Sequence, residues 1–311
     1  MSANLKRGCG ILLIASVVLL SILALLPDAD VDHDAGYTSS ELSIQETVDG
    51  SVTSKSYVNP DGVITEAIDI GYATVCRMRD DNGRVVEERY LDAEGNPIIL
   101  SDGYSIIVRT QVGGRASEDF YYDLNGQQVQ CSGGYYGLHR EFNTEGQNTS
   151  LTFLDKDGHT VSTSSGYAIK TYQRDRNGTV VGEQYFDTEG NPVRSLLGQY
   201  GESYQRNEQG HIGQITYLDA DGNPAPTNAG YTILKRTYHR DGTADTDMYF
   251  DADGNPKALS KGQYGIKRSG KVNLLLDRNS NVMLCVDNLL NGFPYDCKRK
   301  HESIKCESKC L

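Results

Sequence analysis

The phrase YLDADGNP at 217–224 places two carboxylates, Asp219 and Asp221, next to a glycine and an asparagine. Oxygen-rich stretches of this kind can bind calcium, but an EF-type loop has glycine at its sixth position and a bidentate glutamate at its twelfth. Here glycine is fourth, and the twelfth residue from Asp219 is Gly230. We therefore predict turn chemistry and no metal site. Weak calcium binding, repeated along the chain, is the alternative.

Catalytic chemistry finds little support in the sequence. The six histidines, at 33, 139, 159, 211, 239 and 301, share no common position, and no G-x-S-x-G elbow occurs. We predict no catalytic residue, no cofactor and no enzymatic activity. His159 and His211 directly follow glycines of predicted turns, so we expect both to be exposed.

Tyrosines at equivalent positions are the candidate ligand-binding residues. Aromatic faces stack on sugars or peptides, and the hydroxyl supplies a polar group. The alternative is that these side chains form the core. The candidates are Tyr90, Tyr185, Tyr217 and Tyr249.

The phrase itself recurs, as YLDAEGNP at 90–97, YFDTEGNP at 185–192 and YFDADGNP at 249–256. Two further glycine series keep the same period of 31 or 32 residues. Glycine accepts the positive φ that closes a short turn, and an aspartate side chain can accept hydrogen bonds from nearby backbone N–H groups. The predicted structural turn residues are Asp92, Asp187, Asp219, Asp251, Gly95, Gly126, Gly158, Gly190, Gly222 and Gly254.

The elements that position these turns are predicted to be strands. Segments such as GYTILKRTYH and TADTDMYF are short and rich in β-branched and aromatic residues. Each unit is interpreted as a β-hairpin with a short third strand. Because one unit cannot bury its own core, neighbouring units must cover it. The predicted fold is mostly β, an elongated array of about seven 32-residue hairpin repeats that follows one N-terminal transmembrane helix.

The first residues differ in character from the rest. The stretch 8–26 is uncharged, follows Lys6 and Arg7, and precedes an aspartate cluster. Basic residues stay cytoplasmic, so the predicted order is a cytoplasmic stub at 1–7, an anchor at 8–26 and an outer acidic linker and lead-in at 27–56. A β-repeat ectodomain at 57–285 and a basic, Cys-rich, disordered tail at 286–311 follow. A cleaved signal peptide is the alternative to the anchor. The net charge of −12 argues against nucleic-acid binding.

The repeats at 57–292, with phrases such as GYTILKRTYHRDGTADTDMYFDADGNP, resemble the extracytoplasmic repeats of clostridial VanZ-family membrane proteins. A looser similarity joins them to YD (Rhs-type) repeats. The resemblance implies a bacterial envelope protein. Together with the anchor at 8–26, it predicts a single-pass protein of the bacterial cell membrane, with its N-terminus inside. No second apolar span follows residue 294, so the resistance-related activity of that family is not expected.

Two functions remain open. One is a membrane-anchored module that binds a cell-wall polymer or a surface protein. The other is a structural stalk or spacer, or a VanZ-like protein truncated before its membrane domain. An exposed aromatic groove would favour binding, whereas buried tyrosines would favour the stalk.

Overall fold

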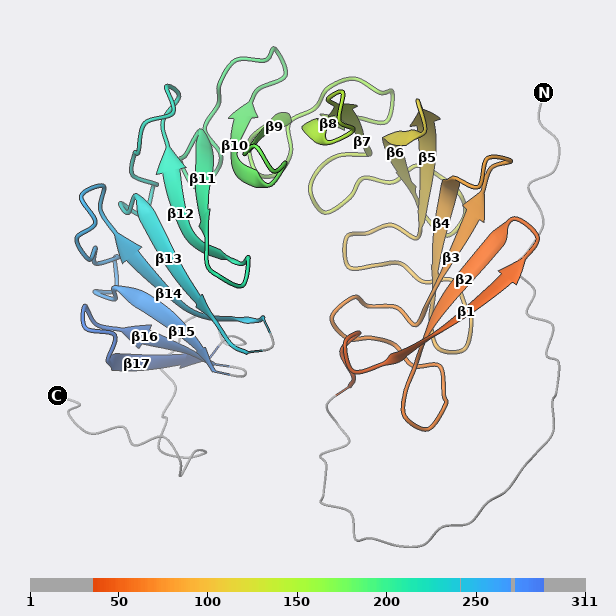
Figure 1. Cartoon of the computed structure of the whole chain (residues 1–311), viewed down its shortest axis with the longest axis horizontal. Helices are drawn as coiled ribbons and strands as arrows, with labels where there is room; N and C mark the ends of the chain where they lie inside the picture. The colour runs from red at the N-terminus through yellow and green to blue at the C-terminus, as the bar shows by residue number, and fades with distance from the viewer. Residues whose placement is uncertain (1–35, 241, 270–271, 288–311) are drawn as a thin grey trace, which may run out of the picture. The chain divides into compact units, whose positions relative to one another are not determined.

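A computed structural model describes residues 36–240, 242–269 and 272–287 (Figure 1). The chain divides into two compact units, Met1–Cys131 and Ser132–Leu311. Every regular element among the described residues is a β-strand, and no helix there could span a membrane. The mostly β prediction is therefore confirmed. The predicted anchor at 8–26 lies outside the described residues.

The strands of the first unit run antiparallel, each paired with the next along the chain. They are β1 (Ser43–Asp49), β2 (Val52–Val58), β3 (Thr74–Arg79), β4 (Val85–Leu91), β5 (Ile106–Val112) and β6 (Arg115–Tyr122). The fold thus begins before residue 57, because 43–58 already forms a hairpin within the predicted linker and lead-in.

The second unit continues the same antiparallel pairing from each strand to the next. Its strands are β7 (Gly137–Phe142), β8 (Asn148–Leu154), β9 (Ile169–Arg174), β10 (Val180–Phe186), β11 (Gly201–Arg206), β12 (Ile212–Leu218), β13 (Ile233–Tyr238), β14 (Ala244–Phe250), β15 (Gly265–Ser269), β16 (Val272–Leu276) and β17 (Val282–Asp287). The last strand passes the predicted boundary at 285 by two residues.

The prediction of a short third strand in each 32-residue repeat is wrong in extent. After the turn that follows β12, only Leu218 and Pro224 form an isolated bridge. The chain then makes a second turn, in which the Thr227 N–H donates to the carbonyl of Tyr231 at 2.9 Å. Too few residues separate the two turns for a longer ladder, and Pro224 has no N–H to donate.

Two kinds of strand pairing alternate along each unit. Within a hairpin the ladder is long, as from Ile233↔Phe250 to Tyr238↔Ala244 between β13 and β14. We call the pairing of one hairpin with the next a seam. The β4–β5, β8–β9, β10–β11, β12–β13 and β14–β15 seams each hold only three residue pairs.

Aromatic side chains form the core along one face of the strands. In the first unit, rings lie 4.7–6.2 Å apart in the order Tyr57, Tyr72, Tyr90, Tyr104 and Tyr121. Strand tyrosines therefore alternate with tyrosines from the loops between hairpins. Such ring pairs contribute about 0.5–1.5 kcal/mol each beyond the area they bury.

The loops between hairpins also bond to one another in the second unit. The Ser164 N–H donates to the carbonyl of Gly133 at 2.8 Å, and the Leu196 N–H donates to that of Ser165 at 2.9 Å. Asn228 repeats the contact with the carbonyl of Leu197 at 2.8 Å. These bonds join loops about one repeat apart, so each loop supports the next.

Candidate functional site

The repeated phrase forms a hydrogen-bonded turn at the end of β12. The Gly222 N–H donates to the carbonyl of Asp219 at 3.1 Å, and the Asp219 N–H donates to the carbonyl of Asn223 at 2.8 Å. The Asp219 carboxylate accepts the backbone N–H groups of Asp221 at 3.0 Å and Asn223 at 2.8 Å. Gly222 has a φ of +83°. This is a type I turn closed by a left-handed glycine.

The other predicted turn residues have the same geometry. Gly95, Gly126, Gly158, Gly190 and Gly254 have φ between +76° and +85°. The carboxylates of Asp187 and Asp251 each accept two backbone N–H groups, and Asp92 accepts that of Asn96. The backbone N–H of Asn255 lowers the pKa of Asp251, and that of Asn191 lowers the pKa of Asp187.

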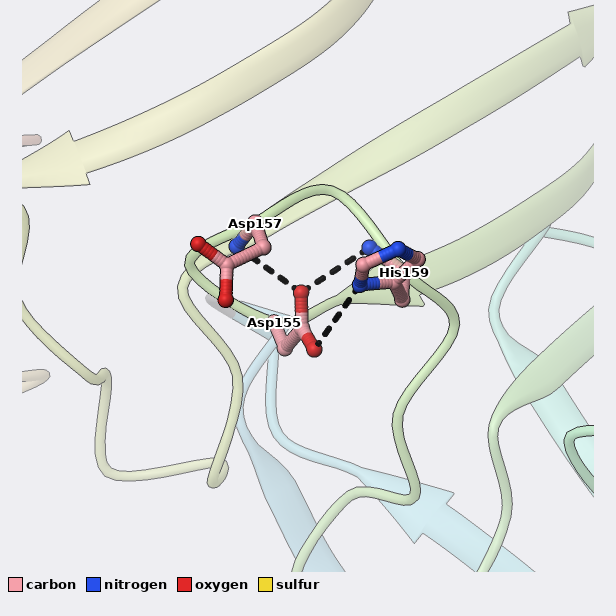
Figure 2. Close-up of side chains that lie close together, drawn as sticks. All are labelled: Asp155, Asp157 and His159. Carbon is pink, nitrogen blue, oxygen red and sulfur yellow. Dashed lines mark hydrogen bonds and ion pairs between the residues drawn. The ribbon is translucent and has the colours of Figure 1, made fainter.

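One turn brings together three side chains of types that bind metals, two aspartates and a histidine (Figure 2). Potential ligand atoms of Asp155, Asp157 and His159 lie within 4.8 Å of one another. Asp155 Oδ1 accepts the backbone N–H groups of Asp157 and His159, each at 2.9 Å. His159 Nδ1 lies 3.6 Å from Asp155 Oδ2. The His159 side chain is 80% exposed, as expected. The turn accounts for the position of Asp155, and the other two side chains lie open to solvent.

His211 differs from that expectation. Its ring is half-buried and stacks on Tyr238, with centroids 4.6 Å apart. Tyr238 belongs to the next hairpin. Its hydroxyl also donates to the carbonyl of Ile212, the residue after His211, at 2.9 Å. Position after a turn glycine therefore does not by itself decide exposure.

The four candidate ligand-binding tyrosines lie in the core. Tyr90, Tyr185, Tyr217 and Tyr249 are each 4–7% exposed, and neighbouring rings contact each of them. Burial raises the pKa of all four, and that of Tyr249 reaches about 12. Their faces are occupied by other tyrosines, which leaves little surface for a ligand.

A row of buried charges continues the aromatic face and is not anticipated from the sequence. Glu88 lies between Arg77, at 2.7 Å, and Arg109, at 3.2 Å. Asp247 lies in the same way between Arg236, at 2.6 Å, and Arg268, at 2.7 Å. Burial opposes ionisation of both carboxyls, but the arginine hydrogen bonds hold their pKa values below the usual range.

The row changes at the β10–β11 seam. Glu183 stands directly opposite Glu202. On β9 and β11, the positions that carry arginine in other hairpins carry tyrosine. Tyr172 and Tyr204 stand where Arg77 and Arg236 stand in other hairpins. Aligning the repeats would have revealed this, because Glu202 occupies the position of Leu234 and Ile266.

A small hollow of about 60 Å³ lies near this seam, lined by side chains that include Phe186, Pro192, Tyr200 and Asp219. Its volume holds little more than a water molecule or two. The hollow is too small to be a pocket for an ordinary ligand.

Comparison with known proteins identifies no family. No family model matches the chain, and no curated protein matches it. A crystal structure of TcdB2-TccC3-TEV is 12% identical, with a TM-score of 0.17. That match covers 81% of this chain and 17% of the other chain.

Proposed function

We propose that this chain is a non-catalytic repeat protein of the bacterial cell envelope whose hairpin array, of about seven 32-residue units, serves as a structural spacer. An N-terminal anchor at 8–26 would hold it in the membrane with the repeats outside. The observation that carries the proposal is the burial of Tyr90, Tyr185, Tyr217 and Tyr249. Tyrosine is the residue type best suited to ligand contact, and here the tyrosines pack one hairpin against the next.

A repeat spacer tolerates loss of a whole unit, because each unit contacts only its neighbours. Deleting residues 223–254 would join Gly222 to Asn255 and restore an intact D-A-D-G-N-P turn. The shortened full-length chain should fold, with an unchanged β-type circular dichroism spectrum and a single cooperative melting transition. Deleting residues 223–238 is the matched control, because it removes one strand and breaks the register.

Collapse of the 223–254 deletion variant would refute the spacer proposal, since it would show one closed core. Orientation is tested separately by adding protease to intact cells. Survival of the repeat region, while a known surface protein is digested, would place the repeats inside.

Binding at the cell surface is a second candidate, favoured by one observation. Leu196 and Leu197 are 70% and 57% exposed at a loop where the other repeats carry residues such as Ser164, Ser165 and Asn228. Co-sedimentation of the full-length chain with isolated cell walls measures this. Saturable binding that a Leu196→Ser, Leu197→Ser variant loses would favour the binding module over the spacer.

A further inference from the structure

The β10–β11 seam differs from the other three-pair seams in its central residue pair. The central pairs elsewhere are Glu88↔Ile107, Leu151↔Lys170, Ile215↔Leu234 and Asp247↔Ile266. Each of these contains at least one apolar side chain. The β10–β11 seam instead places Glu183 opposite Glu202. Like charges directly opposite on paired strands are destabilising.

Polar groups surround the two carboxylates but supply one positive charge. Lys170 Nζ on β9 lies 3.5 Å from Glu183 Oε2. The Tyr185 hydroxyl donates to Glu183 at 2.6 Å. The Tyr204 hydroxyl and Gln199 Nε2 each donate to Glu202 at 3.1 Å.

The remaining titratable groups near the pair are phenols. Tyr172 on β9 stands opposite Glu183, and Tyr217 on β12 stands opposite Glu202. Tyr167 and Tyr231, from the loops before β9 and β13, both interact electrostatically with Glu202. Burial raises the pKa of each, so these phenols stay neutral.

The backbone keeps the two glutamates close. Gly182 and Gly201 flank the pair, and a β-carbon at either would collide with a seam carbonyl, that of Glu202 or Glu183. Larger residues would push the strands apart. The two glycines therefore allow the close approach of the strands that sets Glu183 opposite Glu202.

We propose that Glu183 and Glu202 share one proton and make the β10–β11 seam a pH-sensitive joint, closed in acid and weakened when both carboxylates ionise. Burial, and next the charge of Glu183, raise the pKa of Glu202. A carboxyl group whose pKa is raised in the folded state contributes stability that is fully present below its unfolded pKa, about 4.3. That stability is lost as the pH rises through the folded pKa. The inference does not depend on the proposed function.

Hydrogen exchange of the full-length chain tests the joint locally. Peptides covering 180–186 and 201–206 are compared between the wild type and Glu202→Gln, which carries the uncharged amide. At about pH 8, above a raised carboxyl pKa, the variant should exchange roughly fivefold more slowly in these peptides. At about pH 4, below the unfolded pKa, the two proteins should exchange alike.

Glu88→Gln is the matched control, because Glu88 holds the same seam position as Glu183 but lies between two arginines. It should speed exchange in the peptides covering 85–91 and 106–112 at about pH 8. Glu183→Gln should act in the same direction as Glu202→Gln, and the double variant should add little to either, because one uncharged side chain already removes the repulsion between the two carboxylates.

Three results would overturn the proposal. One is equal or faster exchange in Glu202→Gln at the higher pH. Another is an equal gain at both pH values, which would assign the effect to packing. The third is additive slowing in the double variant, which would show that the two carboxyls do not interact.

Discussion

Replacing Gly222 with alanine isolates the conformational role of the repeated turn. A β-carbon there would meet no atom within 4 Å, so the variant suffers no collision. What remains is a φ of +83°, which L-residues with side chains rarely adopt. The expected loss is about 1 kcal/mol of unfolding free energy.

Gly190 and Gly254 extend the test, because their φ values are +84° and +82° and their surroundings are equally open. Alanine at either should cost the same as at Gly222, within about 0.5 kcal/mol. Urea unfolding of the full-length chain, followed by circular dichroism, measures the three losses at unchanged m-value. Gly201→Ala should cost more, because its β-carbon would collide with the carbonyl of Glu183.

The reasoning is refuted if Gly222→Ala costs nothing, or if the three open-turn variants differ by more than about 1 kcal/mol. The first result would mean that the glycine is not required for φ. The second would mean that the turns are not equivalent and that one has a separate task.

Three more predictions concern the turns and the core. Ser280 stands where other turns carry glycine and has a φ of +66°, so Ser280→Gly should raise stability by about 1 kcal/mol in the same urea assay. The pKa of Asp251 is lowered, so its contribution is present above its unfolded pKa and is lost as pH falls through the folded value; Asp251→Asn should flatten the acid limb of a plot of melting temperature against pH. Tyr185→Phe removes the 2.6 Å hydrogen bond to Glu183 and should cost about 1–3 kcal/mol, measured by urea unfolding, whereas Tyr264→Phe, at a half-buried ring, should cost less.

The turns are predictable from the sequence because their cause is local. A glycine three residues after an aspartate permits the positive φ that closes the turn, and the aspartate carboxylate accepts nearby backbone N–H groups; Asp219 and Gly222 show this geometry. The third strand is not predictable in this way, because its length depends on how soon the next turn begins, at Thr227.

The same distinction between local causes and distant contacts applies to the candidate site. Side-chain types alone leave Tyr217 open as ligand or core, and only the ring contacts with Tyr231 place it in the core. The opposition of Glu183 and Glu202 depends on strand register across the loop between hairpins, which the sequence of one repeat does not specify. The unusual residue type at Glu202 can be found by aligning the repeats, but its partner on the opposite strand cannot be found from one repeat alone.

The contrast between long hairpin ladders and three-pair seams has a mechanical consequence. Most contacts in each hairpin are local in sequence, so a hairpin can reform quickly against its neighbours once the load falls. Tension applied between the ends of the second unit should extend it in steps rather than all at once, with the three-pair seams yielding first. Complete extension of one 32-residue repeat, its hairpin included, would release roughly 100 Å of chain. Such a molecule can lengthen under load and shorten again without losing the fold of every repeat.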